Sequence, residues 1–321
     1  MKTKMAHGNE VSTISTHCLA FLFHMVSISV SRSAALKNTC SVYQARILKL
    51  SQEIQPRVLV NTRGSGNYGE SGKAAFYTID KLPSVLMERD RWNADNLQRT
   101  DLDLGQDRLA FYIDDVLTHD QADALAACAE AILVHNGHSR LAPGINTPSG
   151  MRINQAAHWY PSNEEAAVFL GFILYRVRHL VPPTLDGMPI YERLSEKIAQ
   201  FKYDQGDEFQ RHTDGLFPGQ GANEKGDGVD HWDGVVSGMS MLFYLNDLET
   251  DGLQGGQTRL WSADGSQFVD VKPRKGRVLF FRRGSPNAVV HAGLPVTGEV
   301  PKYIALINLA YGKRTGTGSL L

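Results

Sequence analysis

The segment Phe209-Gln210-Arg211-His212-Thr213-Asp214-Gly215, together with His291 much later in the chain, carries the strongest signal in this sequence. His212 and Asp214 are two residues apart, so on an extended strand their side chains leave the same face and can converge on one ion. Two imidazoles and one carboxylate form the facial triad, which holds Fe(II) and leaves other coordination positions open. These residues predict a catalytic metal site, because structural sites usually close the coordination shell. A chance match is the alternative, since short patterns such as His-x-Asp are common.

The sequence around these residues has the pattern of short strands separated by turns. Apolar runs follow turn residues in four places, which are 238–246, 255–261, 273–281 and 302–311. Strands of this length with turn signals between them indicate an all-β barrel or jelly roll. In such a sheet a strand far along the chain can return beside the strand that carries His212.

Six motifs follow one another along this part of the chain. They are Tyr203 with Phe209, His212 and Asp214; Tyr244-Leu245-Asn246; Gly255-Gly256-Gln257-Thr258; Pro273-Arg274-Lys275-Gly276; His291-Ala292-Gly293-Leu294-Pro295-Val296; and Lys302-Tyr303. In this combination, the chain from about residue 196 to 312 resembles the catalytic domain of the iron- and 2-oxoglutarate-dependent dioxygenases, in the prolyl-4-hydroxylase-like branch. The resemblance implies an α+β, mainly β fold: a double-stranded β-helix (jelly roll) with buttressing helices on one side.

Carried over position by position, the resemblance implies roles for five residues of the site. His212, Asp214 and His291 would be the iron ligands. Tyr203 and Tyr244 occupy the places of phenols that hydrogen-bond 2-oxoglutarate in the family. An ordinary half-buried strand tyrosine is the alternative for each of the two phenols.

The resemblance also places Lys302 where the family has the basic residue that pairs with the distal carboxylate of 2-oxoglutarate. A fixed cation is needed there, because a buried dicarboxylate without a partner is very costly. One departure is that Val300-Pro301 makes the stretch before Lys302 one residue longer than in the family. A β-bulge can absorb the extra residue, whereas a slipped register would turn Lys302 to the wrong face, as a solvated strand lysine.

Three residues are candidates for substrate contact. Arg152 and Asn154 resemble a segment near the mouth of the site in relatives, with a plain polar surface strand as the alternative. Trp232 lies in the Gly- and Asp-rich stretch 218–238, which we expect to be a long solvent loop. Long loops in compact domains are often lids, so Trp232 would cover the substrate.

The activity implied by the resemblance is hydroxylation of a substrate C–H bond, with 2-oxoglutarate and dioxygen converted to succinate and CO2. Fe(II) is the implied metal, and ascorbate is the expected reductant. A prolyl side chain of a protein is the leading substrate class, and a free amino acid or other small molecule is the alternative. Two rival functions use the same fold: a catalytically silent binding scaffold and a nucleic-acid demethylase. The formal net charge of −1 predicts no nucleic-acid partner.

We divide the chain into four segments. Residues 1–57 are expected to be a targeting or disordered N-terminal segment, 58–105 a lead-in, 106–195 a helical support region and 196–315 the jelly-roll core. In the support region, Thr118 and Gln121 form a capping box before a helix over 122–134. Further helices are expected over 164–181 and 189–199.

The N-terminal segment leaves the location of the protein open. Its apolar run Leu19–Val30 is too short to span a bilayer but fits the core of a signal peptide. Its Ser-rich, acid-poor composition fits a mitochondrial transit peptide equally well, and a cytoplasmic protein with a disordered extension is the third possibility. The three cysteines, Cys18, Cys40 and Cys128, predict neither a disulfide framework nor a zinc cluster.

Overall fold

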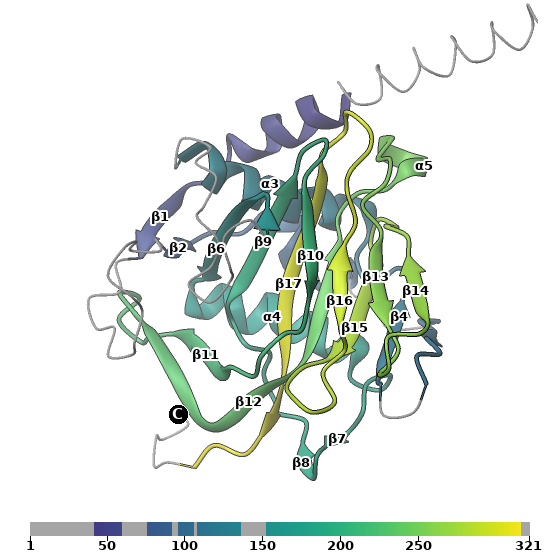
Figure 1. Cartoon of the computed structure of the whole chain (residues 1–321). Coiled ribbons are helices and arrows are strands. Elements are labelled where there is room, and N and C mark those ends of the chain that lie inside the picture. Colours follow the sequence, from purple (N-terminus) through teal and green to yellow (C-terminus); the bar gives the residue numbers. More distant parts are fainter. Residues whose placement is uncertain (1–41, 60–75, 92–95, 106–107, 136–151, 316–321) are drawn as a thin grey trace, which may run out of the picture.

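The computed structural model describes residues 42–59, 76–91, 96–105, 108–135 and 152–315 (Figure 1). These residues form two mainly antiparallel sheets packed face to face, with two long helices behind the larger sheet. This is a mainly β jelly roll with helices on one side, so the predicted fold class is confirmed. Within the described residues, no helix combines the length and the apolar character that a membrane span requires.

The large sheet has the strand order β1–β2–β6–β9–β17–β12–β15–β4–β3, and β11 pairs with β12. Its neighbours run antiparallel except β2 and β6, which are parallel. Two further strands, β7 and β8, form a separate hairpin. The bounds are β1 (Pro56–Leu59), β2 (Phe76–Ile79), β3 (Arg99–Asp101), β4 (Ala110–Ile113), β6 (Gln155–Pro161), β7 (Thr184–Leu185), β8 (Met188–Pro189), β9 (Ile198–Tyr203), β11 (Pro218–Ala222), β12 (Val229–Tyr244), β15 (Val278–Arg282) and β17 (Lys302–Gly312).

The small sheet has the strand order β14–β13–β16–β10–β5 and lies in front of the large sheet in Figure 1. Its strands are β5 (Arg152–Ile153), β10 (Glu208–His212), β13 (Thr258–Trp261), β14 (Phe268–Val271) and β16 (His291–Gly293). Strands β10 and β16 pair directly, with His212 opposite His291. The sheet register therefore brings together two histidines that are far apart in the sequence.

Helices α3 (His119–His135) and α4 (Asn163–Val177) cover the outer face of the large sheet, with the short helices α2 (Ser84–Met87), α5 (Leu248–Asp251) and η1 (Arg89–Arg91) nearby. The predicted capping box opens α3: Gln121 Oε1 accepts from the Thr118 N–H at 2.9 Å, and Thr118 Oγ1 accepts from the Gln121 N–H at 3.3 Å. The prediction of a helix over 189–199 is wrong, because β9 begins at Ile198 and pairs with β17. Strand pairing there overrides the local helical pattern.

Two apolar layers lie on either side of the large sheet. Alternate residues of β17, such as Tyr303 and Ala305, pack toward the helices, while Ile304 packs between the two sheets. Because side chains alternate across a strand, Lys302 lies on the same face as Ile304. The lysine therefore faces the space between the sheets, where the two histidines also lie.

The described part of the N-terminal segment belongs to the folded domain, contrary to the predicted boundary at residue 57. Residues 42–51 form a helix whose Tyr43 and Ile47 are 2% and 1% exposed in the core. Arg46 bridges this helix to α3 and α5 through ion pairs with Asp123 at 3.0 Å and Asp251 at 3.2 Å. The apolar run Leu19–Val30 and the rest of the proposed targeting region lie outside the described residues.

Replacing Ile47 by alanine tests this corrected boundary. The change removes a fully buried side chain, so we expect the free energy of unfolding to fall by about 2–5 kcal/mol. The neighbouring Leu48 is 44% exposed, and Leu48→Ala should change stability by less than about 0.5 kcal/mol. Urea unfolding measures both variants, and equal small effects would show that residues 42–51 contribute nothing to the domain.

Candidate metal centre

His212, Asp214 and His291 meet at one end of the space between the two sheets. One possible ligand atom from each of the three lies within 4.8 Å of the others. His291 is 5% exposed, and His212 and Asp214 are partly buried. The Phe209 ring stacks on His212 at 3.7 Å between ring centroids, and the Phe281 ring lies 4.3 Å from His291. The predicted triad is therefore assembled in a pocket with aromatic walls.

Both imidazoles are oriented by the same local contact. The Nδ1 of His212 lies 2.7 Å from the carbonyl oxygen of Gln210, and the Nδ1 of His291 lies 3.0 Å from that of Val289. A carbonyl at this distance fixes the tautomer with hydrogen on Nδ1, so Nε2 carries the lone pair that can bind a metal. Two imidazole nitrogens near a carboxylate oxygen fit the donor set that Fe(II) takes in a facial triad.

The carboxylate of Asp214 is held by two donors on one of its oxygens. Asp214 Oδ2 accepts from Ser240 Oγ at 2.6 Å and from Arg283 Nη1 at 3.0 Å. Burial alone would raise the pKa of Asp214, but the Arg283 guanidinium, His291 and the Ser240 hydroxyl outweigh burial and hold the pKa well below its ordinary value. The group is therefore a carboxylate at neutral pH, which a metal ligand must be.

Lys302 occupies the same pocket as the triad, although it is only 2% exposed. Its Nζ lies 5.4 Å from the ring centroid of Tyr203 and 5.6 Å from that of Tyr244. No carboxylate among the described residues forms an ion pair with it, and burial lowers the pKa of Lys302 to about 7. A buried ammonium of this kind is costly unless an anion joins it, so the pocket is suited to an anionic ligand.

The register of Lys302 is fixed by Asn246, the last residue of the Tyr-Leu-Asn motif. Asn246 Nδ2 donates to the carbonyl of Pro301 at 2.8 Å, and Asn246 Oδ1 accepts from the Tyr303 N–H at 2.9 Å. The side chain thus clamps the backbone on both sides of Lys302. This clamp settles the ambiguity that Val300-Pro301 created in the sequence: Lys302 faces the pocket.

Replacing Asn246 by alanine should destabilise the fold, because it leaves a buried carbonyl and a buried N–H without partners. Each unsatisfied group costs about 1–3 kcal/mol, so we expect a loss of about 2–5 kcal/mol in the free energy of unfolding. Asn163 makes one exposed hydrogen bond to Asn223, and Asn163→Ala is the matched control. Denaturant unfolding measures the free energy of unfolding of both variants. A loss in Asn246→Ala no greater than that in Asn163→Ala would contradict the role of Asn246.

The two candidate phenols differ in their access to the pocket. Tyr203 lines the pocket. Tyr244 is fully buried and donates its hydroxyl to Thr258 Oγ1 at 2.7 Å, and Thr258 in turn lines the pocket. The Thr258 hydroxyl, rather than that of Tyr244, is therefore placed to contact a ligand directly.

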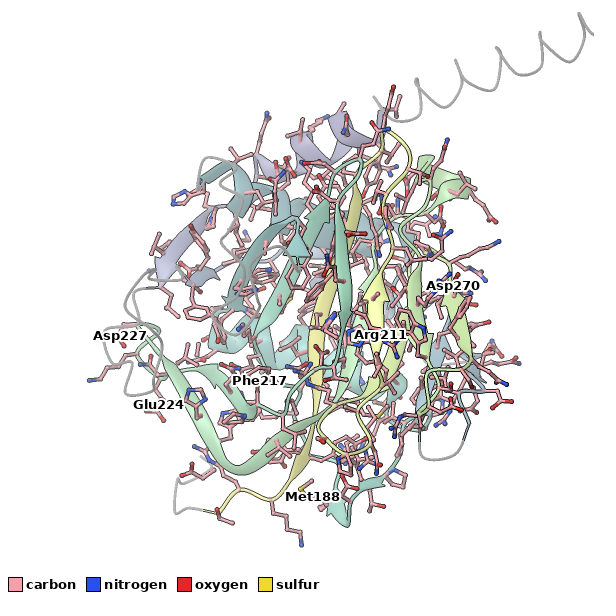
Figure 2. All side chains as sticks on the ribbon, viewed as in Figure 1. Met188, Arg211, Phe217, Glu224, Asp227 and Asp270 are labelled. Atoms are coloured by element: carbon pink, nitrogen blue, oxygen red, sulfur yellow. The ribbon has the colours of Figure 1, made fainter. Side chains whose placement is uncertain are left out.

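The prediction of a long loop over 218–238 is wrong, because these residues form a hairpin of β11 and β12. Glu224 and Asp227 lie at its turn (Figure 2). Trp232 is 4% exposed and packs against Tyr191, with ring centroids 5.5 Å apart. It does not line the pocket of the triad. The structure therefore corrects the prediction of a lid at Trp232.

The other two candidates for substrate contact lie beside β10. Arg152 is on β5 and pairs with Phe209 of β10, and its side chain lies outside the described residues. Asn154 is 4% exposed, and its Nδ2 has no hydrogen-bond partner among the described residues. Contact with a substrate stays a prediction for both residues.

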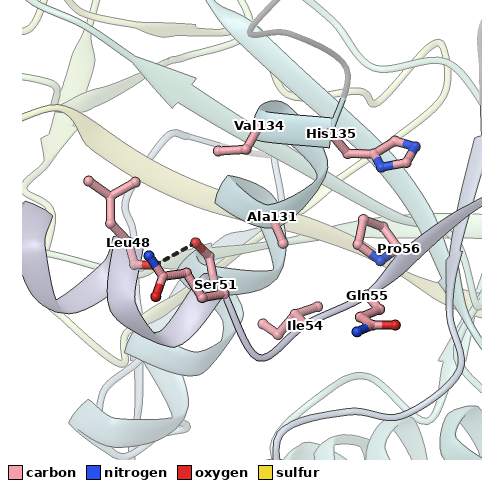
Figure 3. A pocket seen from close by; sticks show the side chains of 9 residues that line it. Leu48, Ser51, Ile54, Gln55, Pro56, Ala131, Val134 and His135 are labelled. Carbon is pink, nitrogen blue, oxygen red and sulfur yellow. Dashed lines mark hydrogen bonds between the residues drawn. The ribbon is translucent and has the colours of Figure 1, made fainter.

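A second cavity, of about 510 Å³, lies between the helix 42–51 and the end of α3 (Figure 3). Its walls contain Leu48, Ile54 and Val134, with Ser51 and His135 among the polar groups. Although this cavity is larger than the pocket of the triad, its lining contains only one side chain of a kind that commonly binds metals, that of His135. The triad pocket is therefore the candidate site.

Sequence reasoning missed Arg283 and Ser240 as partners of the triad. Arg283 is 4% exposed, and Ser240 is fully buried in β12. The sequence offers one signal for the first: two consecutive arginines, Arg282 and Arg283, directly follow a buried strand. A buried arginine usually has a carboxylate partner, but the sequence does not say which one.

Comparison with known proteins agrees with this geometry. Residues 198–310 match the family described as 2OG-Fe(II) oxygenase superfamily. Residues 198–310 are therefore similar to that superfamily. The match supports an oxidoreductase, and the matched family implies Fe(II) and 2-oxoglutarate, for which the triad and Lys302 offer fitting groups. The resemblance to iron- and 2-oxoglutarate-dependent dioxygenases is confirmed.

Solved structures similar to the oxygenase domain include three prolyl hydroxylases. A viral collagen prolyl hydroxylase from Paramecium Bursaria Chlorella virus-1, in complex with 2OG, is 19% identical, with a TM-score of 0.40, covering 64% of this chain and 96% of that one. A Pseudomonas putida prolyl-4-hydroxylase is 23% identical, with a TM-score of 0.41 and coverage of 64% and 93%. A Trichoplax adhaerens prolyl hydroxylase in complex with a hypoxia inducible factor peptide fragment is 17% identical, with a TM-score of 0.39 and coverage of 71% and 89%. These sequence identities and TM-scores are too low to assign a substrate. No curated protein matches the chain.

Proposed function

We propose that this protein is an Fe(II)- and 2-oxoglutarate-dependent dioxygenase that hydroxylates a C–H bond of its substrate and releases succinate and CO2. The observation that carries the proposal is one pocket that contains both the triad and the buried ammonium of Lys302, which has no ion-pair partner in the part of the chain that the structure describes. A dicarboxylate satisfies both ends of such a pocket. A structural metal site would need neither an open face nor a second cation.

The residues of the pocket would have two roles, which are to bind the co-substrate and to exclude water. Lys302 would hold the distal carboxylate through charge-assisted hydrogen bonds, with Thr258 and Tyr203 beside it. Apolar side chains, among them Leu242 and Ile304, line the walls and exclude water. When bound, Fe(II) would supply the one-electron and dioxygen chemistry that amino-acid side chains lack. Ascorbate as the reductant stays a prediction.

The substrate class that we propose first is a prolyl side chain in a protein, with a free amino acid or other small molecule as the alternative. The test incubates the protein with Fe(II), 2-oxoglutarate and isotopically labelled dioxygen. Proline peptides, the same peptides with alanine at proline positions, and free proline are compared by mass spectrometry. A labelled oxygen in the proline peptides alone supports the proposal. Succinate formation without labelling of any proline compound would remove the prolyl proposal and keep the dioxygenase.

The affinity for 2-oxoglutarate should depend on pH through Lys302. Its pKa in the free pocket is about 7, and a bound dicarboxylate would favour the ammonium and raise that pKa. Binding then takes up a proton above neutral pH, so the affinity should fall as pH rises past about 7, by up to tenfold per pH unit. Calorimetry on the protein loaded with redox-inert Zn(II) measures this. The Lys302→Arg variant keeps its positive charge at these pH values, so its affinity for 2-oxoglutarate should not depend on pH in this range. A wild-type affinity that stays constant or rises with pH would contradict the role of Lys302.

A further inference from the structure

The Arg283 guanidinium makes more polar contacts at the triad than its role as a counter-ion requires. Its Nη1 lies 3.0 Å from Asp214 Oδ2, 2.7 Å from Ser240 Oγ and 3.1 Å from Asn308 Oδ1. Its Nε and Nη2 both donate to the carbonyl of Gly215, at 3.0 and 2.8 Å. The one side chain therefore holds both the carboxylate of Asp214 and the backbone that follows it.

These contacts leave the two oxygens of Asp214 in different situations. Oδ2 accepts from both Ser240 and Arg283, whereas Oδ1 lies 3.9 Å from His212 Nε2. Ligand atoms that bind one ion at about 2.1 Å can be at most about 4.2 Å apart. The 3.9 Å separation is thus compatible with a shared ion, and Oδ1 is the oxygen left to bind it.

We propose that Arg283 is the positioning residue of the metal centre: it engages Oδ2 of Asp214 and the carbonyl of Gly215 together, and so presents Oδ1 alone to the ion. The inference rests on the proposed metal site. Charge alone would act in the opposite direction, because a cation this close to the ion repels it. The geometry explains why this residue is an arginine. The planar guanidinium reaches a side chain and a backbone carbonyl at once, which the single nitrogen of a lysine cannot do.

The experiment is a Co(II) titration of the whole chain, followed by the visible absorption of the bound ion. Co(II) reports both affinity and coordination, and needs neither turnover nor dioxygen. Arg283→Met and Arg283→Lys should each bind Co(II) about 10–100-fold more weakly, with an altered spectrum, as expected for the loss of a group that orients a ligand. Ser240→Ala removes the other donor to Oδ2 and should weaken binding in the same direction.

Arg282 provides the matched control. It is the preceding residue, and its guanidinium pairs with Asp186. Because alternate residues of a strand point to opposite faces, its side chain lies away from the pocket. Arg282→Met should therefore bind Co(II) with the wild-type affinity and spectrum. Circular dichroism identifies folded variants, and if Arg283→Met does not fold, Arg283→Lys and Ser240→Ala carry the test.

The outcomes separate this inference from the proposed function. Equal or tighter Co(II) binding by the folded Arg283 variants would overturn it, because Arg283 would then act through charge or through packing alone. Unchanged affinity and spectrum in Ser240→Ala would overturn it as well. Wild-type protein that binds no Co(II) would overturn both this inference and the proposed metal site, whereas wild-type binding with unaffected variants removes this inference alone.

Discussion

The His212→Ala variant is expected to lose about a thousandfold in Fe(II) affinity and, with it, the conversion of 2-oxoglutarate to succinate. Structural zinc sites, which have four protein ligands, contribute about 10–16 kcal/mol of binding free energy, or roughly 2.5–4 kcal/mol for each ligand, and the upper part of this range corresponds to about a thousandfold in affinity. The Phe209 ring, which stacks on His212, offers no donor atom that could replace the imidazole. Anaerobic Fe(II) titration and succinate release measure the two losses.

His231 supplies the control for this variant. It is an exposed histidine of β12, paired with Gln220 in the hairpin and outside the pocket. His231→Ala should keep the wild-type Fe(II) affinity and succinate release. If His212→Ala bound Fe(II) as tightly as this control, the triad would not be the metal site.

The Lys302→Met variant should weaken 2-oxoglutarate binding by about a hundredfold or more while Fe(II) binding persists. Losing one partner of a buried charge pair costs about 2–5 kcal/mol, much of it from the carboxylate that is left unpaired. In the absence of co-substrate the same variant should be at least as stable as the wild type, because burial of Lys302 is not compensated by an anion. Calorimetry with 2-oxoglutarate and thermal unfolding without it measure the two effects.

Lys313, the residue after the other end of β17, is the matched control, because it is exposed. Lys313→Met should leave 2-oxoglutarate binding unchanged, and Lys302→Arg should restore part of it. A Lys302→Met variant with wild-type affinity for 2-oxoglutarate would show that the distal carboxylate binds elsewhere.

The triad could be predicted because its signal is local. His212 and Asp214 are two residues apart at the end of β10, and a distinct motif surrounds His291, the third candidate ligand. The face of Lys302 could not be predicted, because it depends on the long-range clamp from Asn246 to Pro301 and Tyr303. The same holds for Arg283, whose partners lie far from it in the sequence.

The hairpin of β11 and β12 was missed because its glycines suggested a loop. Gly219 lies opposite Trp232, and a Cβ at this position would meet the Trp232 ring at 2.7 Å. The glycine therefore allows close packing rather than flexibility. Similarly, the helix 42–51 could not be recognised, because its place in the core depends on Asp123 and Asp251, which follow much later in the chain.

The most direct test of the account is oxygen-dependent succinate release from 2-oxoglutarate by the purified chain beginning at about residue 42, with Fe(II) and ascorbate. Reactions in air and under anaerobic conditions are compared for the wild type, His212→Ala and Lys302→Met. We expect slow, oxygen-dependent release even without a substrate, abolished in His212→Ala and strongly reduced in Lys302→Met. A folded wild-type protein that neither binds Fe(II) nor releases succinate would contradict it and favour a catalytically silent scaffold.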